Sequence, residues 1–205
     1  MARAATGIGA LLLAAAMALP SAAAAQDDGA ADRLRVGGFL NGGFGGEADV
    51  DFDALVSSSW DADLNPSVGL GTLVDYPVIP YLAVGGMFRL QFLHVDGVDD
   101  DASTAMDLSL LLRARYPFEK GEVYFGVPVG FSMLWVNDDI NPDLDGGPGW
   151  NVGLLAGGQY LITDAIGIFG HLGGLFRGSN HDVPGTDVDI TTKQFILEGG
   201  VSFLL

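Results

Sequence analysis

Apolar and polar side chains alternate along most of the chain after residue 33. The clearest case is the segment 81–94, where Leu82, Val84, Phe88 and Leu90 alternate with small or polar residues. Successive side chains of a β-strand point to opposite faces, so this pattern predicts strands that each have one apolar face. On this basis we expect eight strands, which cover 33–44, 67–76, 81–94, 105–116, 122–135, 150–162, 166–178 and 190–205.

Short and long connections alternate between these segments. Tight turns are expected where Pro, Gly or Asp interrupt the pattern, at 75–80, 117–121 and 163–165. The longer connections are acidic, and they cover 45–66, 96–104, 136–149 and 179–189. A membrane β-barrel has short turns at one end, here called the turn rim, and longer loops at the other, the loop rim.

Aromatic residues help to choose between a membrane barrel and a soluble sandwich or lipocalin-like barrel, which periodicity alone leaves open. Tyr76, Tyr116 and Tyr160 are predicted to point outward beside the short turns, and Trp135 and Trp150 outward at the loop rim. Aromatic girdles at the two membrane interfaces have this placement. We therefore expect an all-β fold, an eight-stranded antiparallel up-and-down transmembrane β-barrel.

The N-terminal segment predicts export. Arg3 supplies a positive charge, residues 8–19 form an apolar stretch, and residues 20–25 are mostly small, as in a signal peptide. We expect cleavage after Ala25, so that residues 1–25 are the signal peptide and 26–205 the barrel domain. An uncleaved membrane anchor is the alternative.

Composition excludes several other classes. The chain has 205 residues, of which 49% are hydrophobic, a formal net charge of -17 and no Cys. No apolar run of about 20 residues follows residue 25, which argues against a membrane-spanning helix. The lack of Cys excludes a disulfide scaffold or a Cys-ligated metal. The acidic balance argues against nucleic acid as a partner.

The segment 190–205 carries a family resemblance. Gly199, Val201, Phe203 and Leu205 share one face of the expected last strand. With the hairpin rhythm of 33–205, they resemble the C-terminal assembly signal of small eight-stranded outer-membrane proteins, the OmpA-like or OmpX-like group. That signal usually ends in Phe, whereas the last residue of this segment is Leu205. The resemblance implies a monomer in the cell outer membrane, in contact with outer-membrane lipid and inserted by the barrel-assembly machinery.

Charged residues on the inward faces form the main candidate site. An eight-stranded barrel has an interior just wide enough for side chains to fill, and charges there must be paired or solvated. We interpret the set as a structural ion-pair network that closes the lumen; the alternative is a narrow conducting path. Its members are Arg35, Asp75, Arg89, Asp107, Arg113, Arg115, Glu122, His171, Arg177 and Glu198.

The acidic loops raise the question of a metal. Asn141, Asp143 and Asp145 are spaced like the first ligands of an EF-hand, but Val152 stands where a bidentate Glu is needed. A full EF-hand is therefore not expected. We predict no cofactor, and at most a weakly bound divalent cation at these loops, whose acids otherwise keep the rim solvated.

The predicted function is that of an integral outer-membrane protein with a structural or surface-interaction role and a closed, polar lumen. Two alternatives remain: a small porin-like channel for ions or small solutes, and a lipid-modifying enzyme. The enzyme hypothesis rests on Ser179 and His181, which share an expected loop, but the sequence has no Gly-x-Ser-x-Gly motif. We predict that the protein is not an enzyme.

Overall fold

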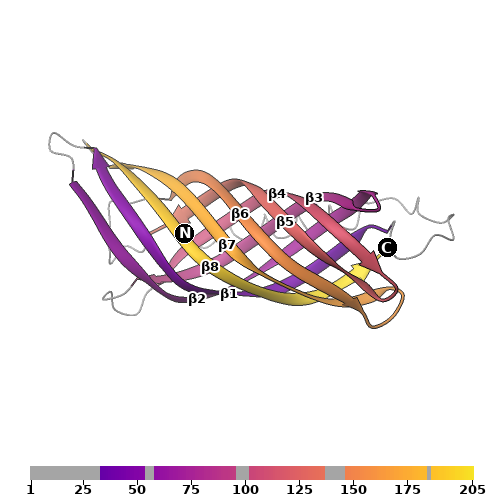
Figure 1. The fold of residues 1–205 in the computed structure, drawn as a ribbon. Helices are drawn as coiled ribbons and strands as arrows, with labels where there is room; N and C mark the ends of the chain where they lie inside the picture. The colour runs from indigo at the N-terminus through magenta and orange to yellow at the C-terminus, as the bar shows by residue number, and fades with distance from the viewer. Residues whose placement is uncertain (1–32, 54–57, 96–101, 137–145, 184–185) are drawn as a thin grey trace, which may run out of the picture.

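A computed structural model describes residues 33–53, 58–95, 102–136, 146–183 and 186–205, so the expected signal peptide lies outside the described residues. Eight antiparallel strands follow one another around a closed barrel, as Figure 1 shows. This confirms the predicted fold. The strands are β1 Arg35–Asp53, β2 Ser58–Ile79, β3 Leu82–Val95, β4 Ser103–Phe118, β5 Gly121–Trp135, β6 Gly147–Leu161, β7 Ile166–Val183 and β8 Thr186–Leu204.

The first and last strands close the ring. β1 pairs with β8 from Arg35 opposite Leu204 to Asp53 opposite Asp187, with a bulge between Phe44 and Gly46. Gly45 in this bulge has φ of 53°, a conformation that glycine adopts without steric cost. Closure leaves no unpaired sheet edge, which a strand surrounded by lipid requires.

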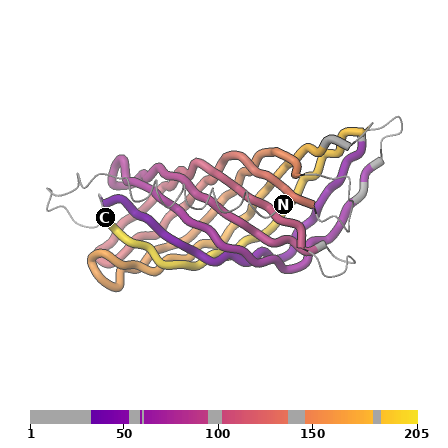
Figure 2. Tube along the Cα trace, turned by 180° about the vertical axis from the view of Figure 1, so that it is seen from behind, coloured from indigo at the N-terminus to yellow at the C-terminus, as the bar shows by residue number. Residues whose placement is uncertain are grey.

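Four strands are longer at the loop rim than the sequence predicted. β1 and β2 continue into the expected loop 45–66, and β7 and β8 into the expected loop 179–189. Their ends project beyond those of the other strands in Figures 1 and 2. We call this projecting sheet the extension. Two effects hid it: the bulge at Gly45 changes which residues point outward, and the outward positions beyond it are acidic rather than apolar.

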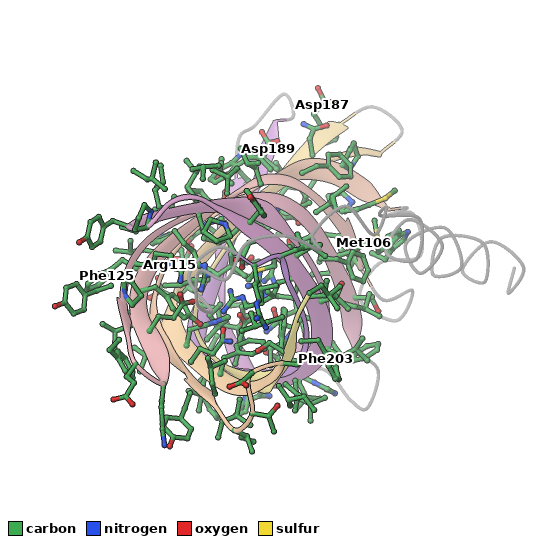
Figure 3. The ribbon with its side chains drawn as sticks, turned by 90° about the vertical axis from the view of Figure 1, so that its right-hand side faces the viewer. Met106, Arg115, Phe125, Asp187, Asp189 and Phe203 are labelled. Atoms are coloured by element: carbon green, nitrogen blue, oxygen red, sulfur yellow. The ribbon has the colours of Figure 1, made fainter. Side chains whose placement is uncertain are left out.

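The outer surface of the barrel is apolar. Leu108, Leu110 and Phe125 are about half exposed or more, and Figure 3 shows Phe125 on the outer side of the ring. Such a continuous exposed apolar surface far exceeds what a soluble monomer presents, so lipid is its natural surrounding. The predicted interface aromatics are also exposed: Tyr76, Tyr116, Tyr160, Trp135 and Trp150.

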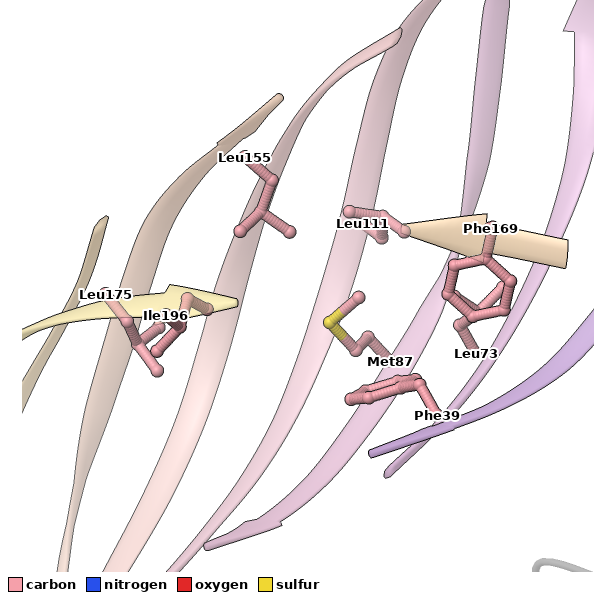
Figure 4. Packing of buried hydrophobic residues seen from close by; sticks show 8 residues of the cluster. All are labelled: Phe39, Leu73, Met87, Leu111, Leu155, Phe169, Leu175 and Ile196. Atoms are coloured by element: carbon pink, nitrogen blue, oxygen red, sulfur yellow. The ribbon is translucent and has the colours of Figure 1, made fainter. Parts of the chain in front are cut away.

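The described residues form two apolar clusters inside the barrel. The central cluster, shown in Figure 4, consists of Phe39, Leu73, Met87, Leu111, Leu155, Phe169, Leu175 and Ile196. The upper cluster lies at the loop rim and contains Val50, Leu93, Ala105, Leu134, Val188 and Ile190. Among the described residues, no helix is long and apolar enough to span a membrane.

Candidate functional site: two ion-pair clusters in the lumen

All ten predicted lumen residues are buried on the inner face of the barrel, the most exposed being Arg115 at 8%. They form two groups. The turn-side cluster consists of Arg35, Asp75, Arg113, Arg115 and Glu122. The loop-side cluster consists of Arg89, Asp107, His171, Arg177 and Glu198. Along β4, Leu111 of the central apolar cluster lies between Arg113 and Asp107.

In the turn-side cluster, three guanidinium groups share two carboxylates. Asp75 Oδ2 accepts hydrogen bonds from Arg35 Nε at 2.9 Å and Nη2 at 2.6 Å, and its Oδ1 accepts from Arg113 Nη2 at 2.8 Å. Glu122 Oε1 lies 2.7 Å from Arg113 Nη1, and its Oε2 lies 2.7 Å from Arg115 Nε. Asp75 therefore bridges two arginines, and Glu122 contacts all three, because its Oε1 also lies 3.6 Å from Arg35 Nη1. One positive charge is left in excess.

In the loop-side cluster, the ion pairs cross the lumen and the charges balance. Arg177 on β7 donates from Nη2 and Nε to Asp107 on β4, at 2.9 and 3.0 Å. Arg89 on β3 donates from Nε to Glu198 on β8 at 2.6 Å, and its Nη1 lies 3.2 Å from Asp107. His171 Nε2 bonds the other Glu198 oxygen. These contacts tie strands on opposite sides of the barrel together.

Neutral side chains complete the loop-side cluster. Gln91 accepts a hydrogen bond from Arg177 Nη2 at 2.5 Å and donates to Gln194 at 2.7 Å, while Ser132 donates to Asp107 at 2.9 Å. Buried charges are stable only when their remaining hydrogen-bonding capacity is satisfied, and these groups satisfy it. Ser132 was not among the predicted network residues, although it stands opposite Asp107 in the register of β4 and β5.

Tyr124 joins the two clusters. Its hydroxyl lies 3.1 Å from Nδ1 of His171, in the loop-side cluster. On the turn side, the guanidinium carbon of Arg113 lies 4.5 Å from the centre of the Tyr124 ring, and that of Arg35 lies 5.5 Å away. A guanidinium at this distance from an aromatic face is attracted to it. The polar lumen is thus one connected set of contacts.

The other residues predicted to have a role, in assembly or in metal binding, lie in two places. Gly199, Val201, Phe203 and Leu205 all lie on the exposed outer face at the end of β8. The candidate metal ligands Asn141, Asp143 and Asp145 lie outside the described residues. Within the described part of the chain, no group of three or more His, Cys, Asp or Glu side chains is arranged to hold a metal ion.

Ser179 and His181 belong to β7, not to a loop as expected from the sequence. Ser179 Oγ lies 3.2 Å from His181 Nε2, within reach of a hydrogen bond. Both side chains are buried inside the barrel. A hydroxyl in this position is not presented to the lipid that surrounds the ring.

An exposed ion pair lies at the base of the extension. Lys193 on β8 donates from Nζ to Asp49 Oδ2 on β1 at 2.8 Å, and both side chains face outward to solvent. The Lys193 hydrogen bond lowers the pKa of Asp49, and Asp49 in turn raises the pKa of Lys193. This pair differs from the lumen pairs because water competes with it.

Comparison with known proteins supports the architecture. No family model and no curated protein sequence matches the chain. Among solved structures, it is similar to the outer membrane protein OprG from Pseudomonas aeruginosa, with 12% identity over 87% of this chain and 99% of that one, and a TM-score of 0.58. The chain has the fold of an outer-membrane β-barrel. This barrel also resembles, more distantly, Neisserial surface protein A (13% identity, 82% and 97% of the two chains, TM-score 0.45). The outer membrane protease OmpT from Escherichia coli is similar at 9% identity over 88% and 99% of the chains, with a TM-score of 0.44.

The fold and the outer surface together define the setting of the molecule. A closed ring of eight strands with an apolar exterior is an integral protein of the outer membrane, in contact with its lipid. The similarity to OprG concerns the fold alone, so the role of the barrel has to be inferred from its own residues.

Proposed function

We propose that this outer-membrane barrel has a structural or surface-interaction role and that its lumen is closed to solutes. The observation that carries the proposal is the pair of cross-lumen contacts, Arg177 with Asp107 and Arg89 with Glu198, which join β7 to β4 and β3 to β8. Apolar clusters lie next to these contacts in the interior. A solute would have to displace both kinds of layer.

The cost of breaking buried ion pairs favours a closed lumen. Separating one partner from a buried ion pair typically costs about 3–5 kcal/mol, because the remaining charge loses its compensation in a poorly solvated place. A continuous path past the loop-side cluster requires that Asp107 and Glu198 release arginines on opposite walls. We therefore expect no steady conduction through the native barrel.

The extension supports a role at the surface. It carries outward acidic side chains beyond the apolar part of the wall, among them Glu47, Asp51, Asp61 and Asp187. This part of the sheet is available for contacts outside the lipid. The exposed residues Gly199, Val201, Phe203 and Leu205 at the end of β8 are proposed to serve insertion by the barrel-assembly machinery. We further propose that the barrel acts as a monomer and needs no cofactor.

Planar-bilayer recording of the purified protein tests the closed lumen. We expect no stable unitary conductance in the unmodified protein. The double variant Arg177→Ala/Arg89→Ala removes two large side chains from the lumen and serves as the positive control, because it should show openings if it folds. Steady ohmic channels in the unmodified protein would reject the closed lumen and favour the porin-like alternative.

The enzyme alternative has its own test. Because Ser179 and His181 are buried inside the ring, we propose that the protein has no lipid-directed activity. Incubation with fluorescent phospholipid in detergent should release no product above the rate of an empty-micelle control. Product formation that disappears in the variant His181→Ala would show that the barrel is an enzyme.

A further inference from the structure

A cavity of about 230 Å³ opens into the barrel at the turn rim. All five members of the turn-side cluster line it, Arg35, Asp75, Arg113, Arg115 and Glu122. Its volume is far above the about 10–15 Å³ that a single water molecule needs. We call it the turn-rim cavity, and Figure 3 views the barrel from this end, with Arg115 on the inner side of the ring.

The charge lining this cavity is not balanced. Arg35, Arg113 and Arg115 contribute three positive charges, and Asp75 and Glu122 contribute two negative ones. The two remaining charged residues of the lining, Arg33 and Glu119, have opposite signs and cancel. The cavity therefore has a net positive charge, although the whole chain has a formal net charge of -17.

The hydrogen-bonding groups of the lining side chains also favour an anion. Three guanidinium groups offer about fifteen N–H donors, whereas two carboxylates offer about eight acceptor sites. Gln159 Oε1 takes one more donor, Arg35 Nη1, at 2.8 Å. In the part of the chain that the structure describes, Nε of the buried Arg113 has no hydrogen-bond partner. Among these side chains, donors thus outnumber acceptors, as the positive charge exceeds the negative.

We propose that the turn-rim cavity is a binding site for an oxyanion, a phosphate or carboxylate group that enters from the turn rim. Arginine forks bind both groups through paired hydrogen bonds. Apolar residues of the lining, Pro117, Phe118 and Leu204, limit solvent around the site and so strengthen the attraction between the anion and the arginines. One bound negative charge would neutralise the excess of the cluster.

The site is a dead end, not an entry to a channel. Phe169 of the central apolar cluster lies directly beyond it, with its ring centre 5.5 Å from the guanidinium carbon of Arg35. An anion held here meets the side chains of Tyr124 and of the central apolar cluster, and beyond them the balanced loop-side cluster. The proposal therefore adds a ligand to the closed barrel without requiring passage through it.

Ligand-dependent stability tests the site. The protein is unfolded by urea in an uncharged detergent at constant ionic strength, with chloride replaced stepwise by inorganic phosphate. We expect the unfolding midpoint of the unmodified protein to rise and then saturate. Arg115→Gln removes the excess charge, and should weaken phosphate binding about tenfold or more, the usual effect of losing a charge-assisted hydrogen bond. The matched control is Lys120→Gln, which removes an exposed charge from the same turn outside the cavity and should bind phosphate as the unmodified protein does.

Two further variants distinguish loss of binding from a simple folding defect. Arg115→Lys keeps the charge but lacks the paired donors of the guanidinium group, so its affinity for phosphate should be intermediate. Glu122→Gln adds to the excess charge and should bind phosphate more tightly than the unmodified protein, which a merely structural role does not predict. In the unmodified protein, arginine Nε–H resonances should shift on titration with phosphate.

A second arm identifies the source of the anion. If a short-chain phosphatidic acid stabilises the protein with the same dependence on Arg115 and inorganic phosphate does not, the site binds a lipid headgroup. If phosphate is sufficient, the ligand is a free solute. The proposal is overturned if neither compound raises the midpoint, or if both act equally on the unmodified protein and on Arg115→Gln.

Discussion

The two ion-pair clusters of the lumen contain the same kinds of side chain but differ in charge balance and in access to the rim. The loop-side cluster has two arginines and two carboxylates, with His171 and several neutral groups completing its hydrogen bonds. The turn-side cluster has three arginines and two carboxylates, and it borders a cavity that opens at the rim. The cluster with balanced charges is enclosed, whereas the cluster with an excess positive charge borders an opening.

Solvation explains this difference. The loop-side cluster is adjacent to the central and upper apolar clusters, so an unpaired charge there has no access to water. The turn-side cluster borders the rim, where water or a bound anion can compensate an extra guanidinium. We therefore propose that the same residue types form a seal in one region and a binding site in the other.

The largest effect is expected from a substitution that prevents the barrel around both clusters from assembling. Phe203 is exposed on the outer face of β8, opposite Val36 of β1 and Ile166 of β7. We predict that Phe203→Asp prevents assembly, because it places a charge on the lipid face and alters the terminal segment. Phe203→Leu keeps the apolar character and is the control. Heat-dependent gel mobility and surface labelling measure assembly, and normal surface levels of the Asp variant would contradict the assignment.

The next prediction compares the two clusters directly, through the stability lost when one carboxylate of each is neutralised. Glu198→Gln deprives both Arg89 and His171 of a partner in the enclosed cluster. The expected loss in free energy of unfolding is about 3–5 kcal/mol, as is typical when one member of a buried pair is removed. Glu122→Gln in the turn-side cluster should cost less, since solvent reaches that cluster through the cavity. Asp63→Asn, at an exposed position of the extension, should be nearly neutral.

Reversible urea unfolding in detergent, followed by tryptophan fluorescence, gives the three values. The order Glu198, then Glu122, then Asp63 is the prediction. Equal losses for the Glu198 and Glu122 variants would mean that enclosure does not distinguish the clusters. A Glu198 variant as stable as the unmodified protein would remove the basis for the closed lumen.

Much of this arrangement was accessible from the sequence, because a strand has a strict period of two. Once the inward parity of a strand is known, Arg89, Asp107 and Glu198 are assigned to the lumen without further information. Strand order follows from the short turns, and closure from the unpaired edges that lipid forbids. Phe203 and Leu205 fall on the outer face by the same rule.

Two features of the structure could not be predicted from the sequence. The division into two clusters depends on the stagger between strands, which the order of residues in one strand does not give. Arg177 and Asp107, for example, lie on strands that are not neighbours, and only the tilt of the barrel brings them together. The extension was missed because the bulge at Gly45 shifts the parity, so that Glu47 and Asp49 follow the outward apolar residues of the same strand.

The smallest expected effect concerns the exposed pair of the extension, which provides a reference for the buried clusters. Asp49 and Lys193 lie on the solvent side of β1 and β8. Because the pKa of Asp49 is lowered from 3.8, its contribution is present above that value and is lost as the pH falls through the lower folded pKa. Because the pKa of Lys193 is raised from 10.5, its contribution is present below 10.5 and is lost as the pH rises through the higher folded pKa. The pair is thus intact across neutral pH.

Lys193→Gln tests this pair mainly through the pKa of Asp49, because an exposed pair is too weak to change the free energy of unfolding clearly. We predict that the pKa of the Asp49 carboxyl, followed by carbon NMR during an acid titration, returns toward its ordinary value in this variant. Added salt should shift it in the same direction in the unmodified protein, since salt screens exposed charges and hardly affects buried ones. The glutamine variant should leave the unfolding midpoint and the ordering of the Glu198 and Glu122 variants unchanged. An unaltered Asp49 pKa, or a loss of stability as large as that of Glu198→Gln, would show that the extension is coupled to the lumen and that exposure is not what separates these ion pairs.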